Sequence, residues 1–412
     1  MSKSSVNKNK LNSIVSVLDF GAVGNGVADD TAAIQAALSA VTKGSIFFPA
    51  GSYKVTSALT IPNNVSFVGN GANATKILRA FTGDFISMGG FCGIENLTID
   101  GQTSIYGAGR GVFFVGNTPN SRMLFAEIIN FSEACLEFGA DAGNAFRAIA
   151  CVFKTTGAVG SVAAVRVNGT DTAASSRHFT NCESAGCTLY DFGGCNDLYV
   201  TGGFTNGLIF GSAGSKVMMT NVRVGASAGA VTVRGSSHQI SNCVFAVAVT
   251  LSCINTFFSC ETPSFAITDS GTGNNVYIGT SVYTPVFAAS GGGASVGNGL
   301  IRGRWSRQGS KIHFQIDFNF GTTTAVGTGN FTFTLPVTDL GSGAVQLIGT
   351  GYVSSNADAC VFVLRQNSPG DGKVTCLYAD GSGVGQVVGA AKPTASWSTG
   401  ATIRMTGTYY VQ

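Results

Sequence analysis

The feature that most constrains the fold is a four-residue phrase that returns along residues 94–261. Each copy reads apolar, any, polar, apolar, as in Ile94-Glu95-Asn96-Leu97 and Phe179-Thr180-Asn181-Cys182. The polar slot falls at Asn96, Glu127, Ala150, Asn181, Thr201, Asn221, Asn242 and Ser259, with Ala150 and Thr201 as weaker copies. The phrase therefore recurs about every twenty residues, with longer intervals in places, which predicts a solenoid of similar coils that carries loops.

The residue types predict which solenoid this is. Val, Ile, Phe and Cys flank the slot, and no apolar residues at helical spacing lie between the copies, so the coils are strands. Asparagine suits a sharp bend between two strands because it tolerates the left-handed backbone conformation. Coils stacked about 4.8 Å apart pair all strand edges except the terminal ones. The sequence therefore predicts a parallel β-helix in which the slot side chains form a column.

A second phrase, out of phase with the first, predicts at least one further strand in each coil. Short strands closed by glycine occur at Val112–Gly116, Leu136–Gly139, Val165–Gly169, Tyr190–Gly193, Leu208–Gly211 and Val231–Gly235. In each strand the middle residue of an apolar-x-apolar triplet points outward. The predicted outward column is Phe113, Glu137, Arg166, Asp191, Ile209 and Thr232.

The cysteines favour buried thiols over a metal site. Eleven cysteines is an odd number, and the sequence holds no C-x-x-C pair and no histidine cluster beside one. Cys151, Cys182, Cys243 and Cys260 follow the bend in different coils, where small apolar side chains can stack inside the solenoid. We expect neither a metal ion nor a cofactor.

Charge and hydropathy exclude two classes of partner. The formal net charge is only +3 and is dispersed, so nucleic-acid binding is not expected. The longest apolar run, residues 244–254, is too short to span a bilayer, so membrane insertion is not expected. The first thirteen residues are polar and lack the apolar region of a signal peptide.

The N-terminal part predicts a helix over residues 30–41 that caps the first coil. Ile34, Leu38 and Val41 share one face of this helix. Asp29 and Asp30 stand at its start, where carboxylates accept from free backbone N–H groups, so we interpret them as capping residues and not as catalytic acids. A terminal coil needs such a cover for its apolar opening.

The phrase from Asp19 to Leu38, DFGAVGNGVADDTAAIQAAL, and the following Phe47-Phe48-Pro49-Ala50-Gly51 resemble the start of pectate-lyase-like β-helix proteins. Within that superfamily the phrase is most similar to bacteriophage tailspikes. The resemblance implies an all-β chain with a right-handed parallel β-helix, a homotrimer, and a virion appendage assembled in the host cytoplasm. It also implies binding, and often cleavage, of bacterial surface polysaccharide.

Composition divides the chain into four parts. Residues 1–16 are expected to be a flexible tail that attaches to phage tail or baseplate proteins. Residues 17–290 are expected to form the β-helix, and residues 291–299, rich in Gly, Ser and Ala, a linker. Strict alternation such as Ile312-x-Phe314-x-Ile316-x-Phe318 then predicts an antiparallel β-sandwich over residues 300–412, for trimerisation or carbohydrate binding.

Two inserts lengthen the coils beside the glycine-closed strands, at Asp100–Gly111 and Asn168–Arg177. Lengthened loops beside a regular face are where solenoids build binding surfaces. We expect Tyr106, Arg110 and Arg177 to contact sugar rings or acidic substituents; the alternative is that they serve only packing and solvation.

The candidate catalytic residues are acids of the outward column. Glu137 and Asp191 lie two coils apart, roughly 10 Å between backbones, from where their carboxyl groups could approach the separation that inverting glycosidases use. Asp141 and Asp171, on turns beside the column, are alternative members. Arg166 lies between the two acids. Its positive charge lowers the pKa of both carboxyl groups and so works against keeping one of them protonated for catalysis, but it suits the binding of an acidic sugar.

Three functions stay open from sequence. A tailspike that hydrolyses a surface glycan is the first, and a receptor-binding spike without catalysis, in which Glu137, Arg166 and Asp191 are only a solvated charge ladder, is the second. The third is a lyase acting on a uronate-containing glycan, which needs a base such as a neutral histidine. His178 and His238 are the available histidines of the β-helix, and packing is the simpler interpretation of both.

Overall fold

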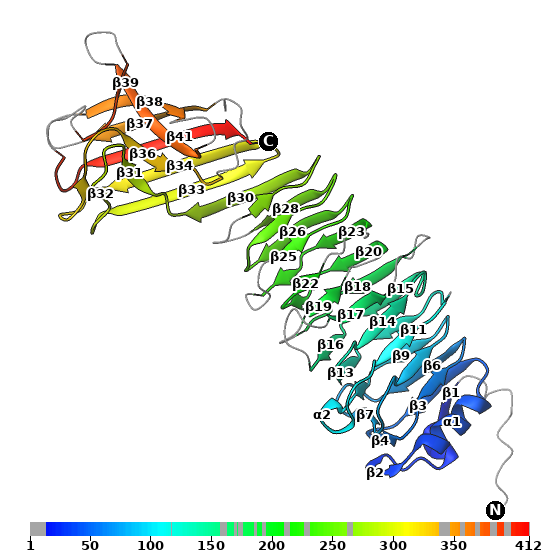
Figure 1. Cartoon of the computed structure of the whole chain (residues 1–412). Coiled ribbons are helices and arrows are strands. Elements are labelled where there is room, and N and C mark those ends of the chain that lie inside the picture. The colour runs from blue at the N-terminus through cyan, green and yellow to red at the C-terminus, as the bar shows by residue number, and fades with distance from the viewer. Residues whose placement is uncertain are drawn as a thin grey trace, which may run out of the picture. The chain divides into compact units, whose positions relative to one another are not determined.

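The protein is described here from a computed structural model (Figure 1). It describes residues 14–411 except 117, 157–162, 169–170, 172–175, 185–187, 192–194, 210–214, 226–230, 262–266, 338–346, 355–358, 367–370, 380–384 and 391–396. The chain divides into two compact units, residues 1–274 and 275–412.

The first unit is a parallel β-helix with three strand faces, which agrees with the expectation of at least two strands in each coil. The first face contains, in order along the stack, β1 (Ile14–Ser16), β3 (Gly44–Phe48), β6 (Val65–Gly69), β9 (Gly93–Glu95), β12 (Arg122–Leu124), β15 (Phe146–Ile149), β18 (Arg177–Thr180), β20 (Asn196–Thr201), β23 (Ser215–Thr220), β26 (Gln239–Phe245) and β28 (Phe257–Glu261). Each strand pairs in parallel with the strand of the next coil. Main-chain hydrogen bonds therefore run along the stack and tie each coil to its neighbours.

The other two faces follow the same rule. The second face contains β2 (Asn25–Asp29), β4 (Gly51–Val55), β7 (Thr75–Arg79), β10 (Thr98–Asp100), β13 (Glu127–Phe131) and β16 (Val152–Thr155), and later β21 (Phe204–Thr205) and β24 (Arg223–Val224). The third face contains β5 (Leu59–Ile61), β8 (Ile86–Met88), β11 (Val112–Phe114), β14 (Leu136–Gly139), β17 (Ala163–Asn168), β19 (Thr188–Asp191) and β22 (Leu208–Ile209). A separate sheet of β25 (Val231–Val233), β27 (Val249–Leu251) and β29 (Ile267–Asp269) follows.

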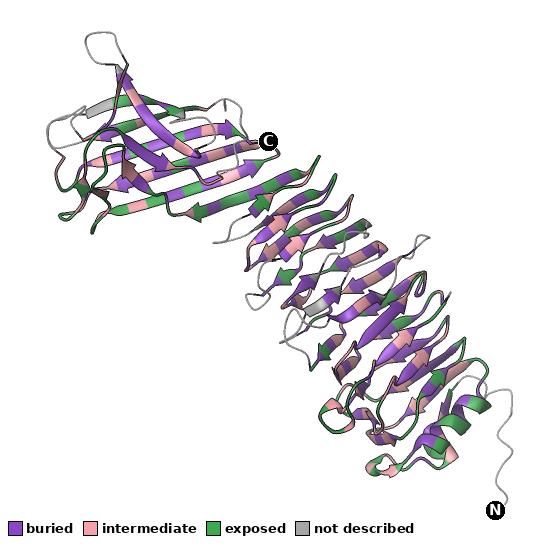
Figure 2. Ribbon diagram, in the orientation of Figure 1, coloured by how far each residue is buried: buried purple, intermediate pink, exposed green. Residues whose placement is uncertain are grey.

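Apolar side chains fill the interior of the β-helix in registered columns. On the first face one such column is Ile46, Phe67, Ile94, Met123, Ala148, Phe179, Val200, Met219, Ile240 and Phe258, and every member is buried. Buried and exposed residues alternate along the strands (Figure 2). Each large side chain of the column stabilises the fold by about 1.5–3 kcal/mol through burial alone.

The predicted column of bends exists, but three of its members differ. Asn96, Ala150, Asn181, Asn221 and Asn242 have positive φ values between 50° and 56°, as expected of left-handed bends. The register places Phe125 (φ 51°) at the bend instead of Glu127, and Gly202 (φ 67°) instead of Thr201. Ser259 pairs with Ser241 and so lies one position before the bend.

Main-chain groups connect these bends. The N–H groups of Asn96, Phe125 and Ala150 donate to the carbonyl before the bend of the next coil, at 2.9–3.0 Å. Because Phe125 and Ala150 interrupt the asparagines, a continuous ladder of amide side chains does not form along this column.

The N-terminal helix is confirmed. Helix α1 (Thr31–Ala40) buries Ile34 and Leu38, and Val41 is buried just after it. Figure 1 shows α1 at the end of the stack where β1 and β3 lie. Asp29 accepts from the Thr31 N–H at 3.0 Å, as a capping residue does, whereas Asp30 turns to the preceding loop and accepts from Val23 and Gly24.

The second unit is antiparallel. Its strands pair in the order β30 (Asn275–Tyr283), β33 (Leu300–Gln308), β34 (Lys311–Asn319), β41 (Thr402–Tyr410), β37 (Ile348–Ser354), β38 (Ala359–Gln366), β39 (Lys373–Ala379), β36 (Phe331–Thr334) and β31 (Phe287–Ala289). Phe287 on β31 contacts the rings of Phe318 on β34 and of Phe331 on β36, at 4.9 and 5.0 Å between centroids. The contact with Phe318 joins strands that are distant in the sheet order, whereas β36 is the strand paired with β31.

Three predicted domain limits are wrong. Ile14–Ser16 is a strand of the first coil and not part of the tail, because it pairs with β3. The second unit begins at Asn275 and not at residue 300, because β30 and β31 pair antiparallel with β33 and β36. The expected linker contains β32 (Ala294–Ser295), which pairs with β35 (Ala325–Val326). Among the described helices, none is long and apolar enough to cross a membrane.

Candidate functional site

The predicted outward column of the third face is present in the predicted register. Phe113 lies opposite Glu137, Glu137 opposite Arg166, and Arg166 opposite Asp191. Asp191 in turn lies opposite Ile209, while Thr232 belongs to the next sheet. The strands β11, β14, β17 and β19 therefore bring the expected residue types together on one face.

Glu137 is not solvated as a residue on an outer face would be. Only 2% of it is exposed, because arginines from both neighbouring coils cover it. Arg110 Nη1 donates to Glu137 Oε1 at 2.5 Å, and Arg166 Nε donates to Glu137 Oε2. Each carboxylate oxygen thus accepts from a guanidinium group, which satisfies the charge of a buried acid.

Arg110 connects this acid to a second carboxylate. Its Nε and its backbone N–H donate to Asp84 Oδ1 at 3.0 and 3.1 Å, and its guanidinium carbon lies 4.5 Å from the centroid of the Phe113 ring. Hydrogen bonds from Arg110 lower the pKa of Asp84, and the Asp84 carboxylate raises the pKa of Arg110. We call Asp84, Arg110, Glu137 and Arg166 the Glu137 cluster.

Asp191, the second predicted acid, is only partly described. Its backbone in β19 lies opposite Arg166 and two coils beyond Glu137, while its side chain lies outside the described residues. The two arginines of the cluster are partly accessible, with 24% of the Arg110 side chain and 29% of the Arg166 side chain exposed. The accessible groups of this cluster are therefore these two cations and the Asp84 carboxylate, of which 35% is exposed, while its central acid is covered.

Of the two alternative acids, Asp171 belongs to the interior, whereas Asp141 is half-buried on a turn. Asp171 and Arg177 form an ion pair at 2.7 Å in which both side chains are completely buried. The Asp171 carboxylate also accepts from the N–H groups of Asp141 and Asn196, and Arg177 donates twice to the Ala142 carbonyl. This pair ties adjacent coils together, so the expected contact of Arg177 with a sugar is wrong for this conformation.

Tyr106 lies on the first insert, away from the contacts of the Glu137 cluster. It ends α2 (Thr103–Tyr106), and its carbonyl accepts from Thr82 at 2.6 Å. Buried Arg79 holds the rest of the insert by donating to the carbonyls of Gly101, Gly107 and Ala108 at 2.7–3.0 Å. The insert is thus fixed to the wall of the β-helix, with Tyr106 half-buried.

The first face carries an outer column that the sequence interpretation missed. Strand pairing places Arg122, Arg147, His178, Tyr199, Met218 and Gln239 in one row, one residue from each successive coil. Arg122, Arg147, Met218 and Gln239 are exposed, and His178 and Tyr199 are half-buried. We call this row the His178 column. Its signal is present in the sequence, since each member stands three residues before a bend, but reading it requires the correct bends.

His178 and Tyr199 form the centre of this column. Their rings stack with centroids 4.5 Å apart and planes 4° from parallel, and Ser176 Oγ lies 2.7 Å from His178 Nε2. Partial burial, and next the positive charge of Arg147 one coil away, lower the pKa of His178. The imidazole is therefore neutral at neutral pH and can accept a proton.

His238 is a packing residue, as expected. It is 2% exposed, its Nδ1 accepts from the Val217 N–H at 3.2 Å, and its Nε2 lies 2.6 Å from the Arg234 carbonyl. Burial lowers the pKa of its imidazole. In the part of the chain that the structure describes, no three His, Cys, Asp or Glu side chains are grouped closely enough to hold a metal ion.

Fold and surface define the first unit as a parallel β-helix with charged and aromatic side chains on its regular faces. Residues 14–252 match the sequence profile of the rhamnogalacturonase A/epimerase, pectate lyase-like family, which is more than half of the chain. The chain belongs to this family.

Curated relatives match over shorter segments. Mannuronan C5-epimerase AlgE1 of Azotobacter vinelandii is 36% identical over 126 residues, which is 25% of this chain and 9% of that protein. Alginate lyase 7 of the same organism is 40% identical over 124 residues, 25% of this chain and 14% of its own length. The SPbeta prophage-derived protein YomE of Bacillus subtilis is 30% identical over 131 residues, 28% of this chain and 20% of YomE. The chain thus covers a fifth or less of each of these relatives.

Solved structures resemble the chain more distantly. ORF18 of Geobacillus virus E2 matches with a TM-score of 0.49 and 18% identity, over 92% of this chain and 87% of that one. The Dettilon tailspike protein matches with a TM-score of 0.45 and 12% identity, over 97% and 95% of the two chains.

Proposed function

We propose that this chain is a phage tailspike subunit that binds an acidic bacterial surface polysaccharide and cleaves it by β-elimination at the His178 column. Three observations support the assignment to a phage tailspike: the family membership, the N-terminal phrase and the prophage-derived relative. The relatives named as mannuronan epimerases and alginate lyase support a uronate polymer as the ligand. A homotrimer attached through its N-terminus is part of the proposal.

The single observation that carries the chemistry is the row Arg147, His178 and Tyr199 on consecutive strands of a regular face. Removal of the proton next to a uronate carboxylate needs a cation to bind that carboxylate and a base to take the proton. Arg147 supplies the cation and neutral His178 the base, with about 4.8 Å between neighbouring backbones.

The proton transfer can be written for the observed contacts. When His178 Nε2 donates to Ser176, Nδ1 carries a free lone pair that can remove the proton from C5 of the uronate. The C5–H electrons form the C4–C5 double bond as the bond from C4 to the glycosidic oxygen breaks. The departing oxygen takes a proton, for which the Tyr199 hydroxyl is the donor one coil away.

Hydrolysis at the Glu137 cluster is the second candidate, favoured by the register of Glu137, Arg166 and Asp191 on one face. Inverting hydrolysis needs one carboxyl group that donates a proton and one that activates water. Both oxygens of Glu137 already accept from arginines, so neither is placed to donate. This geometry favours binding of an acidic sugar by Arg110 and Arg166 over hydrolysis.

The test uses the full chain with alginate, polygalacturonate and candidate host capsules, and dextran as a neutral control. Reducing ends report any cleavage, ultraviolet absorbance reports unsaturated ends, and deuterium uptake at C5 in heavy water reports proton removal without cleavage. We expect reducing and unsaturated ends together. His178→Gln should lower the rate by 10²-fold or more, which is the usual contribution of a general base.

His313→Gln is the matched control, because His313 lies in the second unit and should leave the rate unchanged. Reducing ends without unsaturated ends, lost in Glu137→Gln, would establish hydrolysis instead. An unchanged rate in His178→Gln would overturn the assignment of the base. Deuterium uptake without cleavage would replace the lyase with an epimerase, and binding without any product would leave a receptor-binding spike.

A further inference from the structure

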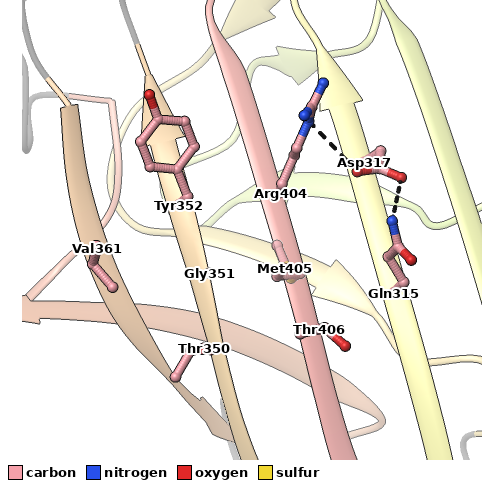
Figure 3. A pocket seen from close by; sticks show the side chains of 9 residues that line it. All are labelled: Gln315, Asp317, Thr350, Gly351, Tyr352, Val361, Arg404, Met405 and Thr406. Atoms are coloured by element: carbon pink, nitrogen blue, oxygen red, sulfur yellow. Dashed lines mark hydrogen bonds and ion pairs between the residues drawn. The ribbon is translucent and has the colours of Figure 1, made fainter.

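The second unit contains a hollow on one face of its antiparallel sheet. A cavity of about 510 Å³ lies over β34, β41, β37 and β38 (Figure 3). A second cavity of about 320 Å³ adjoins it toward β33. The two share Gln315, Asp317 and Arg404. We call the combined hollow the C-terminal groove.

Strand register explains why these side chains meet. Tyr352 lies opposite Arg404, Arg404 opposite Asp317, and Asp317 opposite Arg302. Because alternate residues of a strand share a face, the other side of the same strands packs the core with Ile403, Met405, Ile316 and Phe318. The core therefore holds the floor of the groove in place. The pairing of β37, β41, β34 and β33 fixes the positions of the polar side chains above it.

The groove has a surplus of positive charge. Arg302, Arg304 and Arg404 are exposed, and Asp317 is the acid among its lining residues. Arg404 Nε lies 3.7 Å from Asp317 Oδ1, a loose pair, and 64% of the Arg404 side chain stays exposed. Gln315 donates to the other Asp317 oxygen at 2.9 Å. At least two guanidinium groups are thus available to an anionic ligand.

The opposite side of the groove is apolar. Tyr352 is 43% exposed and Val361, directly across from it on β38, is 71% exposed. Figure 3 shows the Tyr352 ring beside Arg404 over the sheet. An exposed aromatic ring next to guanidinium and amide groups suits a pyranose ring that carries a carboxylate, since the ring stacks and the carboxylate pairs.

We propose that the C-terminal groove is a second binding site for an anionic polysaccharide, separate from the β-helix. It shares its ligand class with the proposed function but uses none of the same residues. Arg302, Arg304 and Arg404 bind uronate carboxylates, Tyr352 stacks on a sugar ring, and Gln315 and Asp317 bind hydroxyl groups. Once one site has bound a polymer, the second site binds the same polymer at a high effective concentration. The protein therefore stays on the polymer longer, without any change in the cleavage step.

The experiment compares full-length variants on immobilised alginate, with dextran as the neutral reference. The variant Arg302→Gln with Arg404→Gln removes two cations, and Tyr352→Ala removes the ring. Arg223→Gln with Arg234→Gln is the control, because it removes two exposed charges from the β-helix. We expect the groove variants to bind alginate at least tenfold more weakly and the control to bind within twofold of the wild type.

Cleavage of short oligouronates separates this inference from the proposed function. If the groove is the second site, its variants keep the wild-type rate on oligomers and lose binding only on polymer, whether or not His178 is the base. Unchanged polymer binding in the groove variants would overturn the inference. A changed oligomeric state in light scattering would overturn it too, because the face would then be a contact between copies.

Discussion

The buried ion pair of Asp171 and Arg177 predicts a large local effect of a small substitution. Asp171→Asn removes the charge that compensates a completely buried guanidinium, and it places an amide N–H₂ group against donors. In the native chain the carboxylate accepts from Arg177 at 2.7 and 3.0 Å, from Asp141 N at 2.9 Å and from Asn196 N at 3.1 Å. Loss of one partner of a buried pair typically costs about 3–5 kcal/mol.

Native-state hydrogen exchange measures this cost where it arises. The N–H groups of Asp141 and Asn196 are bonded to Asp171, so their exchange should accelerate roughly 10²- to 10⁴-fold in Asp171→Asn, at about 1.4 kcal/mol per factor of ten. The N–H of Glu127 donates to the Leu97 carbonyl and has no bond to Asp171, so its exchange rate should change little. Asp100→Asn is the matched control, because Asp100 is half-buried and bonds only neutral donors, Gln102 N and Asn130 Nδ2, in the contacts seen here.

A double-mutant cycle tests the physical reason. If Arg177 is costly because it is left uncompensated, then Asp171→Asn combined with Arg177→Met should cost less than the two single variants added together, by about 0.5–3 kcal/mol. Strict additivity would refute the argument from an uncompensated charge. An effect below about 1 kcal/mol in Asp171→Asn would show that water or a rearranged loop replaces the lost partner.

Three other predictions concern stability and access. His238 stays neutral in the folded chain because burial lowers its pKa, whereas in the unfolded chain it binds a proton at a higher pH. The free energy of unfolding should therefore fall as the pH drops below about 6.5. Urea titrations should show a shallower fall in His238→Gln. The nine described cysteines are all buried, so peptide mapping after maleimide treatment of the native protein should find them unmodified, and fast labelling of Cys151 would contradict the packed interior. Arg79→Met removes the hydrogen bonds to the carbonyls of Gly101, Gly107 and Ala108, which hold the first insert. Chymotrypsin should therefore cut after Tyr106 at least about tenfold faster than in the wild type. An unchanged rate would show that other contacts hold α2.

The period of the sequence was sufficient for the architecture, because strand pairing repeats the same local pattern in every coil. The register of Phe113, Glu137, Arg166 and Asp191 followed from apolar alternation alone. The bends at Phe125 and Gly202 were missed because a left-handed residue inside a well-paired stack does not have to be asparagine. At such a position the neighbouring coils determine the conformation and propensity has little weight.

Burial was the property that sequence could not supply at the site. Glu137 occupies the predicted outward position, yet arginines from two neighbouring coils close over it. Arg177 looked like a loop cation, whereas its side chain turns inward to Asp171. The arginines that cover Glu137 are 27 and 29 residues away from it in the sequence, and Asp171 is six residues before Arg177. One phrase read alone therefore cannot distinguish a solvated charge from a buried pair.

The left-handed bends have a consequence for how this surface can change. Phe125, at one bend, is 57% exposed, and the neighbouring bends are occupied by asparagine and alanine without any shift of the paired strands. Residues can therefore be exchanged at these corners while the packed columns inside stay as they are. A lineage under pressure to meet new partners could revise such a molecule one corner at a time, each step costing the rest of the chain almost nothing.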